Sequence, residues 1–501
     1  MVAVFPPSRT RDQPMNNDRS PLLETLKQCA DRSHVPFYAP GHKRGAGIPG
    51  ELADWWGRSI FGADLPELPE LDDLAAPSGV IREAQDLAAE TFGADRTWFL
   101  INGSTAGIIA AIVATCNPGD KIIVPRNVHK SAISGLILSG AMPVFIPPEY
   151  DRPWDMALGL SPSAVAAALA AHPDAKAVML VSPTYHGVCS DLDGIARIAH
   201  SRGIPVLVDE AHGPHFGFHP HLPPSALRSG ADLAVQSTHK VLGAMTQASM
   251  MHLRGDRIAG DRLHRALQLV QTTSPSYLLL ASLDAARRQM ATQGEGLMQQ
   301  TLQLAREART RIAAIPGLSV WEMPTEDTAG CFALDPTRMT VKVTGLGISG
   351  YDADEILHEE LGVTAELALP AHLTFILSLG NTATDIDRLV DGLTVLSDRY
   401  FPSATTAPHP FPITHDPLPP TRLSPRDAFF APTETVPIAE SIDRTSAELI
   451  CPYPPGIPIL MPGEEITPGA IDRLCAILHS GGHLSGCSDP QLETIQVIRN
   501  R

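Results

Sequence analysis

The stretches VLVDEAHG (206–213) and LAVQSTHK (233–240) decide the fold of this chain. Each begins with a short apolar run that does not alternate with polar residues, which is typical of a strand buried on both faces. Each run ends in a cluster of polar side chains. Because ligands of a mainly parallel sheet bind at the carboxyl ends of its strands, we expect a binding site where these two runs end.

Apolar runs of the same kind recur upstream, and segments of helical periodicity separate them. The pattern predicts strands at 97–101, 121–124, 143–146, 177–181, 206–209 and 233–236. It predicts helices at 84–92, 103–114, 129–139, 161–171 and 194–202. This alternation predicts the α/β class, with a mainly parallel sheet covered by helices.

The rest of the chain divides into shorter units. We expect a flexible arm at 1–20, a large domain at 21–310, a small α/β domain at 311–401, a Pro-rich linker at 402–436 and a C-terminal domain at 437–501. A long helix at 278–315 leads into the small domain, which should hold strands 339–343 and 373–378 and helices 353–361 and 384–396. Proline fixes φ and removes an N–H donor, so 402–436 should be extended and contain no helix or strand.

The composition bounds the function. The formal net charge of −17 makes nucleic acid an unfavourable partner, and it favours cationic ligands or simply solubility. The seven cysteines are odd in number and none has C-x-x-C spacing, which fits a reducing compartment and no zinc knuckle. No signal peptide and no apolar run of membrane-spanning length is present, so we expect a cytoplasmic protein that does not cross a membrane.

Lys240 is the first candidate for chemistry. It ends an apolar strand beside Ser237 and His239, where a surface charge would be poorly placed. A buried lysine with a lowered pKa is a Schiff-base former, and the neighbouring hydroxyl and imidazole groups could hold a phosphate. Taken alone, the motif also fits a partly exposed loop lysine.

Asp209 ends the preceding expected strand, thirty-one residues before Lys240. Pyridoxal phosphate (PLP) needs an acid beside its pyridine nitrogen, because the carboxylate keeps that nitrogen protonated and the ring electron-withdrawing. A metal ligand or a helix cap is the alternative, since His212 and His215 follow. The segment DEAHGPH provides no tetrahedral ligand set by itself, so we expect no metal.

Two further motifs follow earlier strands. INGSTAG (101–107) places Ser104 and Thr105 at a helix start, where backbone N–H groups and the helix dipole bind anions, although a simple N-cap by Ser104 is also possible. NVHKS (127–131) places His129 where a neutral imidazole could stack on a flat ring, or serve as a cap or core residue. All four motifs fall at the carboxyl ends of successive strands, which favours one shared site.

At this point the sequence resembles a known family. GHKRG (41–45), LDDL (71–74), NGST (102–105), HKS (129–131), DEAHG (209–213), QSTHK (236–240), TTSPSY (272–277) and TSAELICPYPPGIPILMPGE (445–464) are similar to motifs of the Orn/Lys/Arg decarboxylases. These enzymes have the aspartate-aminotransferase fold, fold type I of PLP-dependent enzymes. The resemblance covers nearly the whole chain from about residue 20.

The resemblance implies roles for the candidates. Lys240 would hold PLP as a Schiff base, Asp209 would pair with the pyridine nitrogen and His129 would stack on the ring. His239 or Lys240 would return a proton to the substrate Cα. The remaining cofactor contacts would come from Ser104, Thr105, Ser237 and His239 at the phosphate, from Ala211 and His212 beside the ring, and from Thr272 and Ser274 of a neighbouring subunit.

The implied activity is the decarboxylation of a basic amino acid. Glu448 would meet the distal cation of the substrate, and arginine is favoured over lysine and ornithine because short family members include arginine decarboxylases. GHKRG begins at residue 41, so the chain resembles the short form, for which we expect a homodimer with shared active sites. An aminotransferase or aldolase of the same fold, or a PLP-binding regulator, is the alternative.

Overall fold

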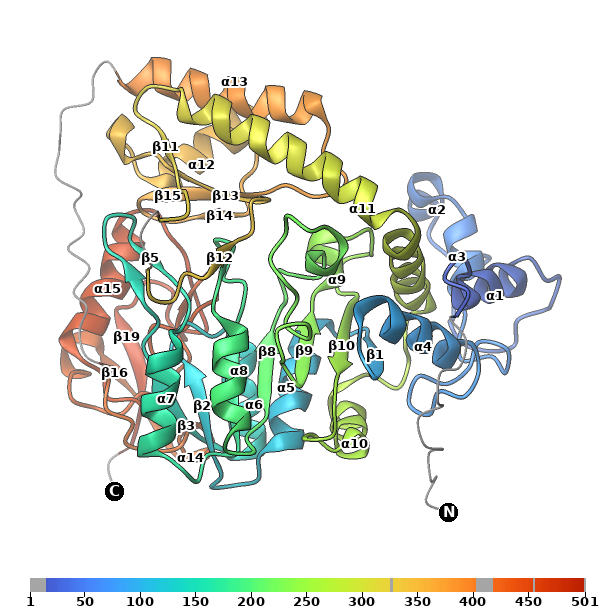
Figure 1. Cartoon of the computed structure of the whole chain (residues 1–501), viewed down its shortest axis with the longest axis horizontal. Helices are drawn as coiled ribbons and strands as arrows, with labels where there is room; N and C mark the ends of the chain where they lie inside the picture. Colours follow the sequence, from blue (N-terminus) through green and yellow to red (C-terminus); the bar gives the residue numbers. More distant parts are fainter. Residues whose placement is uncertain (1–14, 325–327, 402–417, 454–455, 500–501) are drawn as a thin grey trace.

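The computed structural model describes residues 15–324, 328–401, 418–453 and 456–499 (Figure 1). Its largest unit is a seven-stranded sheet with the order β1-β10-β9-β8-β6-β2-β3. β10 runs antiparallel to both of its neighbours, and the other six strands share one direction. The predicted α/β class with a mainly parallel sheet is therefore confirmed. The strands are β1 (Arg96–Leu100), β2 (Lys121–Pro125), β3 (Met142–Ile146), β6 (Ala177–Val181), β8 (Val206–Asp209), β9 (Leu233–Gln236) and β10 (Ser249–Leu253).

Helices cover both faces of this sheet. On one face lie α5 (Gly103–Thr115), α6 (Lys130–Ser139) and α10 (Gly260–Val270), and on the other lie α7 (Pro162–Ala171) and α8 (Leu192–His200). Within β2, Ile122 packs in the first core and Ile123 in the second. Both faces are thus apolar, which explains why the strands show no polar alternation. Near the β1 edge α4 (Val80–Phe92) completes the covering and ends at Gly93 in the left-handed conformation.

The small domain follows the long helix α11 (Tyr277–Ala313), and it lies at the top of Figure 1. Its antiparallel sheet has the order β11-β13-β15-β14, and α11, α12 and α13 pack against it. The two strands and two helices expected here are present, with ends shifted by a few residues, while the short strands β11 and β14 were not predicted. The bounds are β11 (Ser319–Val320), β13 (Arg338–Lys342), α12 (Gly350–Glu359), β14 (Leu367–Ala368), β15 (His372–Ile376) and α13 (Ala383–Tyr400).

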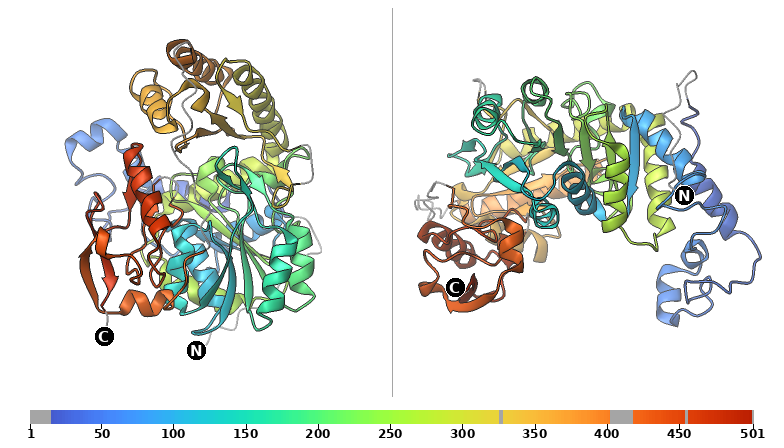
Figure 2. Two further views of the ribbon diagram at one scale, coloured as in Figure 1. Left: turned by 90° about the vertical axis from the view of Figure 1, so that its left-hand side faces the viewer. Right: turned by 90° about the horizontal axis from the view of Figure 1, so that it is seen from below.

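The C-terminal part is a separate unit beside the large domain, drawn in red in Figure 2. Arg426 of α14 donates a hydrogen bond to the carbonyl of Leu138 in α6, at 2.9 Å, and so ties the two units together. The prediction that residues 402–436 contain no helix or strand is wrong, because α14 and the start of β16 lie within this segment. Pro425 begins α14 and does not prevent regular structure, because proline is favoured in the first turn of a helix, and β16 begins within the same segment at Thr433. Residues 402–417 lie outside the described part. The elements are α14 (Pro425–Phe430), β16 (Thr433–Pro437), β17 (Cys451–Pro452), α15 (Pro468–His479), β18 (Leu484–Ser485) and β19 (Thr494–Ile498).

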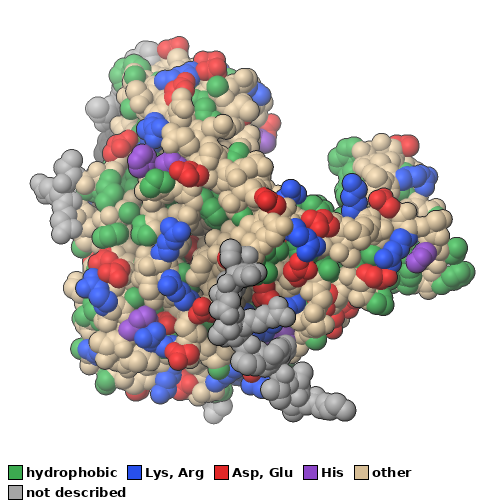
Figure 3. Space-filling view, turned by 45° about the vertical axis from the view of Figure 1, so that its right-hand side comes forward, with side chains coloured by type: hydrophobic (Ala, Val, Ile, Leu, Met, Phe, Trp, Pro, Cys, Tyr) green, Lys and Arg blue, Asp and Glu red, His purple; other side chains and the backbone are tan. Residues whose placement is uncertain are grey.

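The N-terminal segment forms a projecting lobe, visible on the right of Figure 3. α1 (Pro21–Ala30) packs on α4 and α11, whereas α2 (Gly50–Trp56) buries none of its residues. The predicted arm at 1–20 falls largely on residues 1–14, which are outside the described part. None of the helices described is long and apolar enough to cross a bilayer. The remaining short elements are α3 (Ser59–Ala63), β4 (Tyr150–Asp151), β5 (Met156–Ala157), β7 (Val188–Cys189), α9 (Thr238–Val241) and β12 (Ala333–Leu334).

Candidate active site

Parallel strands end side by side at the candidate site. Asp209, the last residue of β8, pairs with the last residue of β6 on one side and with Val235 of β9 on the other. β9 leads into α9, which carries Lys240 and lies on the edge of the sheet that faces the small domain (Figure 1). β2 and β1 end in the same direction and lead into His129 and Ser104. The structure therefore brings the four sequence motifs to one edge of the sheet.

Lys240 is half-buried, and its Nζ lies 2.9 Å from Nε2 of His212. The same nitrogen lies 5.6 Å from the centre of the Tyr185 ring. Burial lowers the pKa of Lys240, while the charges of Asp209 and Glu366 oppose that shift. A lysine with a lowered pKa has more of its uncharged form at neutral pH, and that form attacks aldehydes.

Asp209 is buried, with 6% of its surface exposed. Its Oδ1 accepts a hydrogen bond of 3.1 Å from the backbone N–H of Ala211. Burial raises the pKa of Asp209 to about 6, although the charge of Lys240 and the Ala211 N–H act in the opposite direction. Within the described part of the chain this is the one hydrogen bond that the carboxylate accepts, so Oδ2 keeps capacity for a cationic N–H group such as a protonated pyridine.

The start of α5 can receive an anion. Its N-cap residue Asn102 makes no capping hydrogen bond, because Asn102 Oδ1 accepts from the backbone N–H of Thr272 at 3.0 Å instead. Ser237 Oγ lies 2.8 Å from Ser104 Oγ, so these two hydroxyls are adjacent, and Thr105 is exposed at the same helix start. Uncapped N–H groups and hydroxyls at a helix N-terminus are a donor set that fits a phosphate.

His239 has a defined tautomer. Its Nδ1 lies 2.9 Å from the carbonyl oxygen of Ala248, which can only accept, so Nδ1 carries a proton. Burial lowers the pKa of His239, and the Ala248 carbonyl opposes this shift. The neutral ring therefore presents an unprotonated Nε2. An anion at this nitrogen would favour the charged ring, which could then donate from both nitrogens.

His129 is the N-cap of α6, and its Nδ1 accepts a hydrogen bond of 3.2 Å from the backbone N–H of Ser131. Burial lowers the pKa of His129 to about 4, and the charges of Lys240 and Lys130 add to the shift. The ring is thus neutral at physiological pH and can stack on a flat ring. The C-terminal domain reaches this point, because the carbonyl of Gly456 accepts from the Lys130 N–H at 3.2 Å.

His212 connects the two domains. Its Nδ1 lies 3.2 Å from Nη2 of Arg338 in β13, and its backbone carbonyl accepts from the same nitrogen at 3.1 Å. Three residues further on, His215 pairs with Asp335 at 3.1 Å, and both side chains are fully buried. Arg338 and Asp335 thus contact these two histidines, and among the described residues no group of three or more His, Cys, Asp and Glu side chains could hold a metal ion.

Three predicted site residues make no hydrogen bond, ion pair or ring contact with Lys240 in the described part of the chain. Thr272 and Ser274 are exposed, in the loop that precedes α11. Glu448 is buried in the C-terminal domain, where its Oε1 accepts a hydrogen bond of 2.8 Å from the backbone N–H of Ser488. Its Oε2 has no hydrogen-bond partner in the described part of the chain. The roles of these residues stay predictions.

A cavity of about 340 Å³ opens where the three domains meet. The large domain contributes Tyr185, whose ring lies close to Lys240, and Arg126. The small domain contributes Tyr351, and the C-terminal domain contributes Ile459 and Arg473. The cavity is therefore a route by which a small molecule can reach the Lys240 region.

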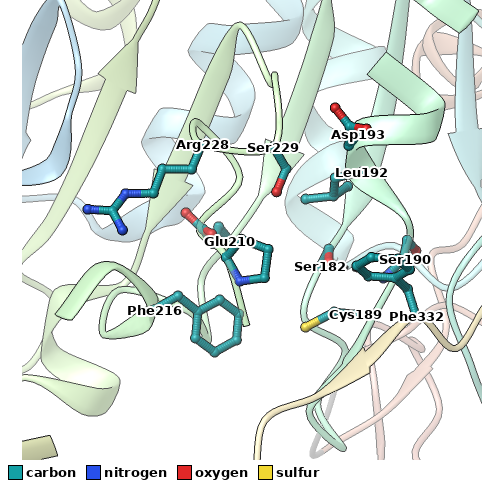
Figure 4. A pocket seen from close by; sticks show the side chains of 11 residues that line it. Ser182, Cys189, Ser190, Leu192, Asp193, Glu210, Phe216, Arg228, Ser229 and Phe332 are labelled. Carbon is teal, nitrogen blue, oxygen red and sulfur yellow. Dashed lines mark hydrogen bonds between the residues drawn. The ribbon is translucent and has the colours of Figure 1, made fainter. Parts of the chain in front are cut away.

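A second cavity, of about 220 Å³, lies on the other side of the end of β8 (Figure 4). Its wall includes Glu210, Cys189, Phe216 and Arg228. Glu210 accepts hydrogen bonds from the Ala226 N–H at 2.7 Å and from the Gln236 amide at 2.8 Å. This carboxylate therefore ties β8 to β9 and to the chain that follows.

The sequence motifs did not identify Tyr185, Arg338 and Glu366, which act on Lys240. Tyr185 and His186 follow β6 in the segment SPTYHG, and the aromatic pair Tyr185–His212 has ring centroids 4.7 Å apart. Arg338 and Glu366 come from the small domain, whose placement over the large domain is not readable from local pattern. A charged residue at the start of the otherwise uncharged strand segment RMTV was the available signal for Arg338.

These features define a class of protein. A mainly parallel seven-stranded sheet, a lysine after β9, an aspartate at the end of β8 and a small α/β domain on a long helix form fold type I of the PLP-dependent enzymes. The chain belongs to the Orn/Lys/Arg decarboxylase family. The family model described as Orn/Lys/Arg decarboxylase, major domain, matches residues 20–385, and the one described as the C-terminal domain matches residues 414–487.

Relatives and solved structures agree with this assignment. An arginine decarboxylase of Bacillus subtilis is 41% identical over 487 residues, which cover 97% of this chain and 99% of that protein. A lysine decarboxylase of Francisella novicida has a similar structure, with a TM-score of 0.81, 24% identity and coverage of 96% of this chain and 82% of that chain. An alanine–glyoxylate aminotransferase of Nostoc shares the fold at a TM-score of 0.52 and 20% identity, covering 66% of this chain and 89% of that one.

Proposed function

We propose that this chain is a PLP-dependent decarboxylase of a basic amino acid and that arginine is its preferred substrate. The observation that carries the proposal is the half-buried amine of Lys240 beside the buried carboxylate of Asp209, which keeps an acceptor position open for a ring nitrogen. Membership of the Orn/Lys/Arg decarboxylase family supports the reaction, and the relative of 41% identity supports arginine.

The residues present fit PLP. Lys240 Nζ would hold the aldehyde carbon, Asp209 would accept from the ring nitrogen, and His129 and Ala211 would cover the two ring faces. The phosphate of PLP would lie against the uncapped start of α5 and the adjacent hydroxyls of Ser104 and Ser237. When bound, PLP supplies an electron-withdrawing ring that takes up the electron pair left on Cα as CO2 departs. The phosphate donors would be Ser104, Thr105, Ser237 and His239.

The protein side chains would then direct the reaction. Asp209 keeps the ring nitrogen charged, because its buried carboxylate gains a cationic partner there. Lys240, and His239 in its charged form, are the acids that can return a proton to Cα. Arg338 has no exposed surface, and its Nη2 is engaged by the ring and the carbonyl of His212. A strong ion pair to the substrate carboxylate would stabilise the ground state and oppose loss of CO2.

The distal cation of the substrate needs a carboxylate. We assign this role to Glu448, whose Oε2 is buried without a hydrogen-bond partner in the described residues. A guanidinium would satisfy that oxygen by a charge-assisted hydrogen bond.

The test is a substrate screen. The purified protein with PLP is given arginine, lysine or ornithine, and amine and CO2 are measured, with Lys240→Ala as the control. We expect amine and CO2 in equal amounts, fastest from arginine, and at least ~10³-fold less turnover in the control. Formation of a keto acid without CO2 would instead identify an aminotransferase. Absence of a visible absorbance band with PLP would point to a non-catalytic protein.

We also propose a homodimer with shared active sites, in the cytoplasm. Thr272 and Ser274 are exposed next to the predicted phosphate site, and the projecting lobe exposes Phe37 and Trp55. Sedimentation should give twice the chain mass. Mixing Lys240→Ala chains with Thr272→Trp chains should restore part of the activity, because one site of each hybrid dimer is then intact. No restoration would argue against shared sites.

A further inference from the structure

A buried chain of contacts runs from the small domain to Lys240. Arg338 Nη2 lies 3.2 Å from Nδ1 of His212, and Nε2 of the same ring lies 2.9 Å from Lys240 Nζ. Arg338 has no exposed surface and His212 has 4%. The imidazole therefore stands between a permanent cation and the amine that would hold the cofactor.

The contacts fix the protonation of His212. A guanidinium has only donors, so His212 Nδ1 must be the acceptor in its contact with Arg338. The neutral ring then carries its proton on Nε2, and this N–H points to Lys240 Nζ. A charged ring is excluded, because it would place a second N–H donor against the guanidinium. Lys240 Nζ must accept from Nε2, which only an uncharged amine can do.

We propose that Arg338 is a positioning residue that acts through His212 to hold the Lys240 amine in its uncharged form before the cofactor binds. The inference extends the proposed function, in which Lys240 carries PLP. Arg338 touches neither the amine nor the open cavity, so its effect passes through the ring.

The surrounding structure holds Arg338 in place. His215 pairs with Asp335, which lies three residues before Arg338. The segments 212–215 and 335–338 are therefore joined by two contacts, His215–Asp335 and His212–Arg338. The backbone N–H of Asp335 donates to the carbonyl of Gly187 at 2.8 Å. Gly187 has φ +86°, and a Cβ there would lie 2.7 Å from Cβ of Arg338. The close approach of these two segments therefore needs a glycine at position 187.

Other charged groups also act on the amine. Burial lowers the pKa of Lys240, the charges of Asp209 and Glu366 raise it, and the charge of Arg338 lowers it. Burial lowers the pKa of His212 well below its ordinary range, and the charge of Arg338 adds to this shift. The other titratable groups that face His212 are Lys240, His129 and His239. Removal of Arg338 therefore acts in one direction, toward a protonated amine.

The test measures the amine without its cofactor. Apo protein is acetylated with trace acetic anhydride from pH 6 to 11, and mass spectrometry follows the Lys240 peptide. The uncharged amine attacks a carbonyl carbon, acetate leaves and the proton goes to water, so the labelling midpoint reports the pKa of Lys240. In Arg338→Met we expect the midpoint to rise by roughly one pH unit, which slows labelling about tenfold below the midpoint.

Three further variants separate positioning from folding. Arg338→Lys keeps a cationic donor for Nδ1 and should restore most of the wild-type midpoint. In His212→Phe, addition of Arg338→Met should shift the midpoint much less than in the wild type, because the intermediary is gone. Arg309→Met is the matched control: Arg309 is also buried, and it donates to the carbonyl of Arg338 at 2.7 Å without touching His212. It should lower the melting temperature and leave the midpoint unchanged.

An unchanged midpoint in folded Arg338→Met would overturn the inference, as would an equal shift in Arg309→Met. Addition of PLP to the same samples tests the proposed function separately, through the visible absorbance of the Schiff base and borohydride reduction at Lys240. A shifted midpoint without any Schiff base would refute the role of Lys240 in binding PLP, but it would still support the effect of Arg338 on Lys240 through His212.

Discussion

Asp209 and Glu210 are consecutive residues at the end of β8, and the two buried carboxylates meet opposite sides of the sheet. Glu210 has a donor on each oxygen, from the Ala226 N–H and from Gln236. Asp209 accepts one hydrogen bond, from Ala211, and faces the charge of Lys240. Burial raises the pKa of both, to about 8 for Glu210 and about 6 for Asp209. A carboxyl group with a protein donor on each oxygen supports the fold, whereas one with an oxygen that accepts no hydrogen bond is placed for a ligand.

The strongest test of this difference between Asp209 and Glu210 is to replace each side chain by its amide. We expect Asp209→Asn to lower kcat/KM for the preferred amino acid by ~10²-fold or more, because the ring nitrogen loses its charged partner. Glu210→Gln should stay within about threefold of the wild type, since it lies on the far side of the strand. Steady-state kinetics of both variants, saturated with PLP, measure the difference. Equal losses would show that the two sides do not have separate roles.

The next largest effect is on folding. Glu210→Ala leaves the Ala226 N–H and the Gln236 amide without an acceptor, so the free energy of unfolding should fall by about 3 kcal/mol. Denaturant unfolding of the apo protein measures this loss. Asp209→Ala removes one acceptor only and should cost less. A reversed order would contradict the assignment of Glu210 to the fold.

The pH dependence of stability sharpens the same contrast. The pKa of Glu210 rises from 4.5 to about 8 on folding, so the folded state holds a proton that the unfolded state releases between these values. Wild-type stability should therefore fall as the pH rises through this range. In Glu210→Gln this contribution is absent, so the stability of the variant relative to the wild type should improve by about 4 kcal/mol between pH 5 and pH 9. Parallel curves for the two proteins would argue against a buried, protonated Glu210.

The smallest expected effect belongs to a residue on the Asp209 side. His129→Ala should weaken PLP retention by about 3- to 10-fold, as expected for loss of one ring contact, and His129→Phe should restore most of it. Because the pKa of His129 is about 4, retention through this residue should not change between pH 6 and pH 9. Equilibrium dialysis measures both. A dependence that follows the titration of an ordinary histidine would contradict a neutral stacking ring.

The sequence was sufficient for six of the seven strands and for the motifs at the carboxyl edge of the sheet, because strands buried on both faces and the turns after them are local signals. Asp209 was placed correctly at the end of a strand, and the next predicted strand is its neighbour in the sheet, as consecutive βαβ units suggest. Lys240 itself lies in the short helix α9 and not at the end of that strand. The chemical roles of Asp209 and Lys240 remain proposals.

Long-range contacts were beyond the sequence pattern. Arg338 reaches His212 only because β13 of the small domain is carried over the large domain, and no periodicity in either segment encodes that approach. β10 runs against the other strands, which a βαβ pattern does not suggest. The helix α14 was missed because the many prolines around it led to the prediction of an extended segment. Serine at 424, which accepts from the Asp427 N–H at 3.0 Å, was the cap signal available there.

The helix α11 is 37 residues long, and at 1.5 Å per residue it extends about 55 Å. Its first turns pack in the core near β1, its middle packs with Phe216, and its last turns pack in the small domain. This single helix thus contributes side chains to three separate hydrophobic cores. Unfolding of the small domain must disrupt α11, which also packs in the large domain. The two domains should therefore unfold in a single cooperative transition, and their amide hydrogens should exchange at similar, slow rates.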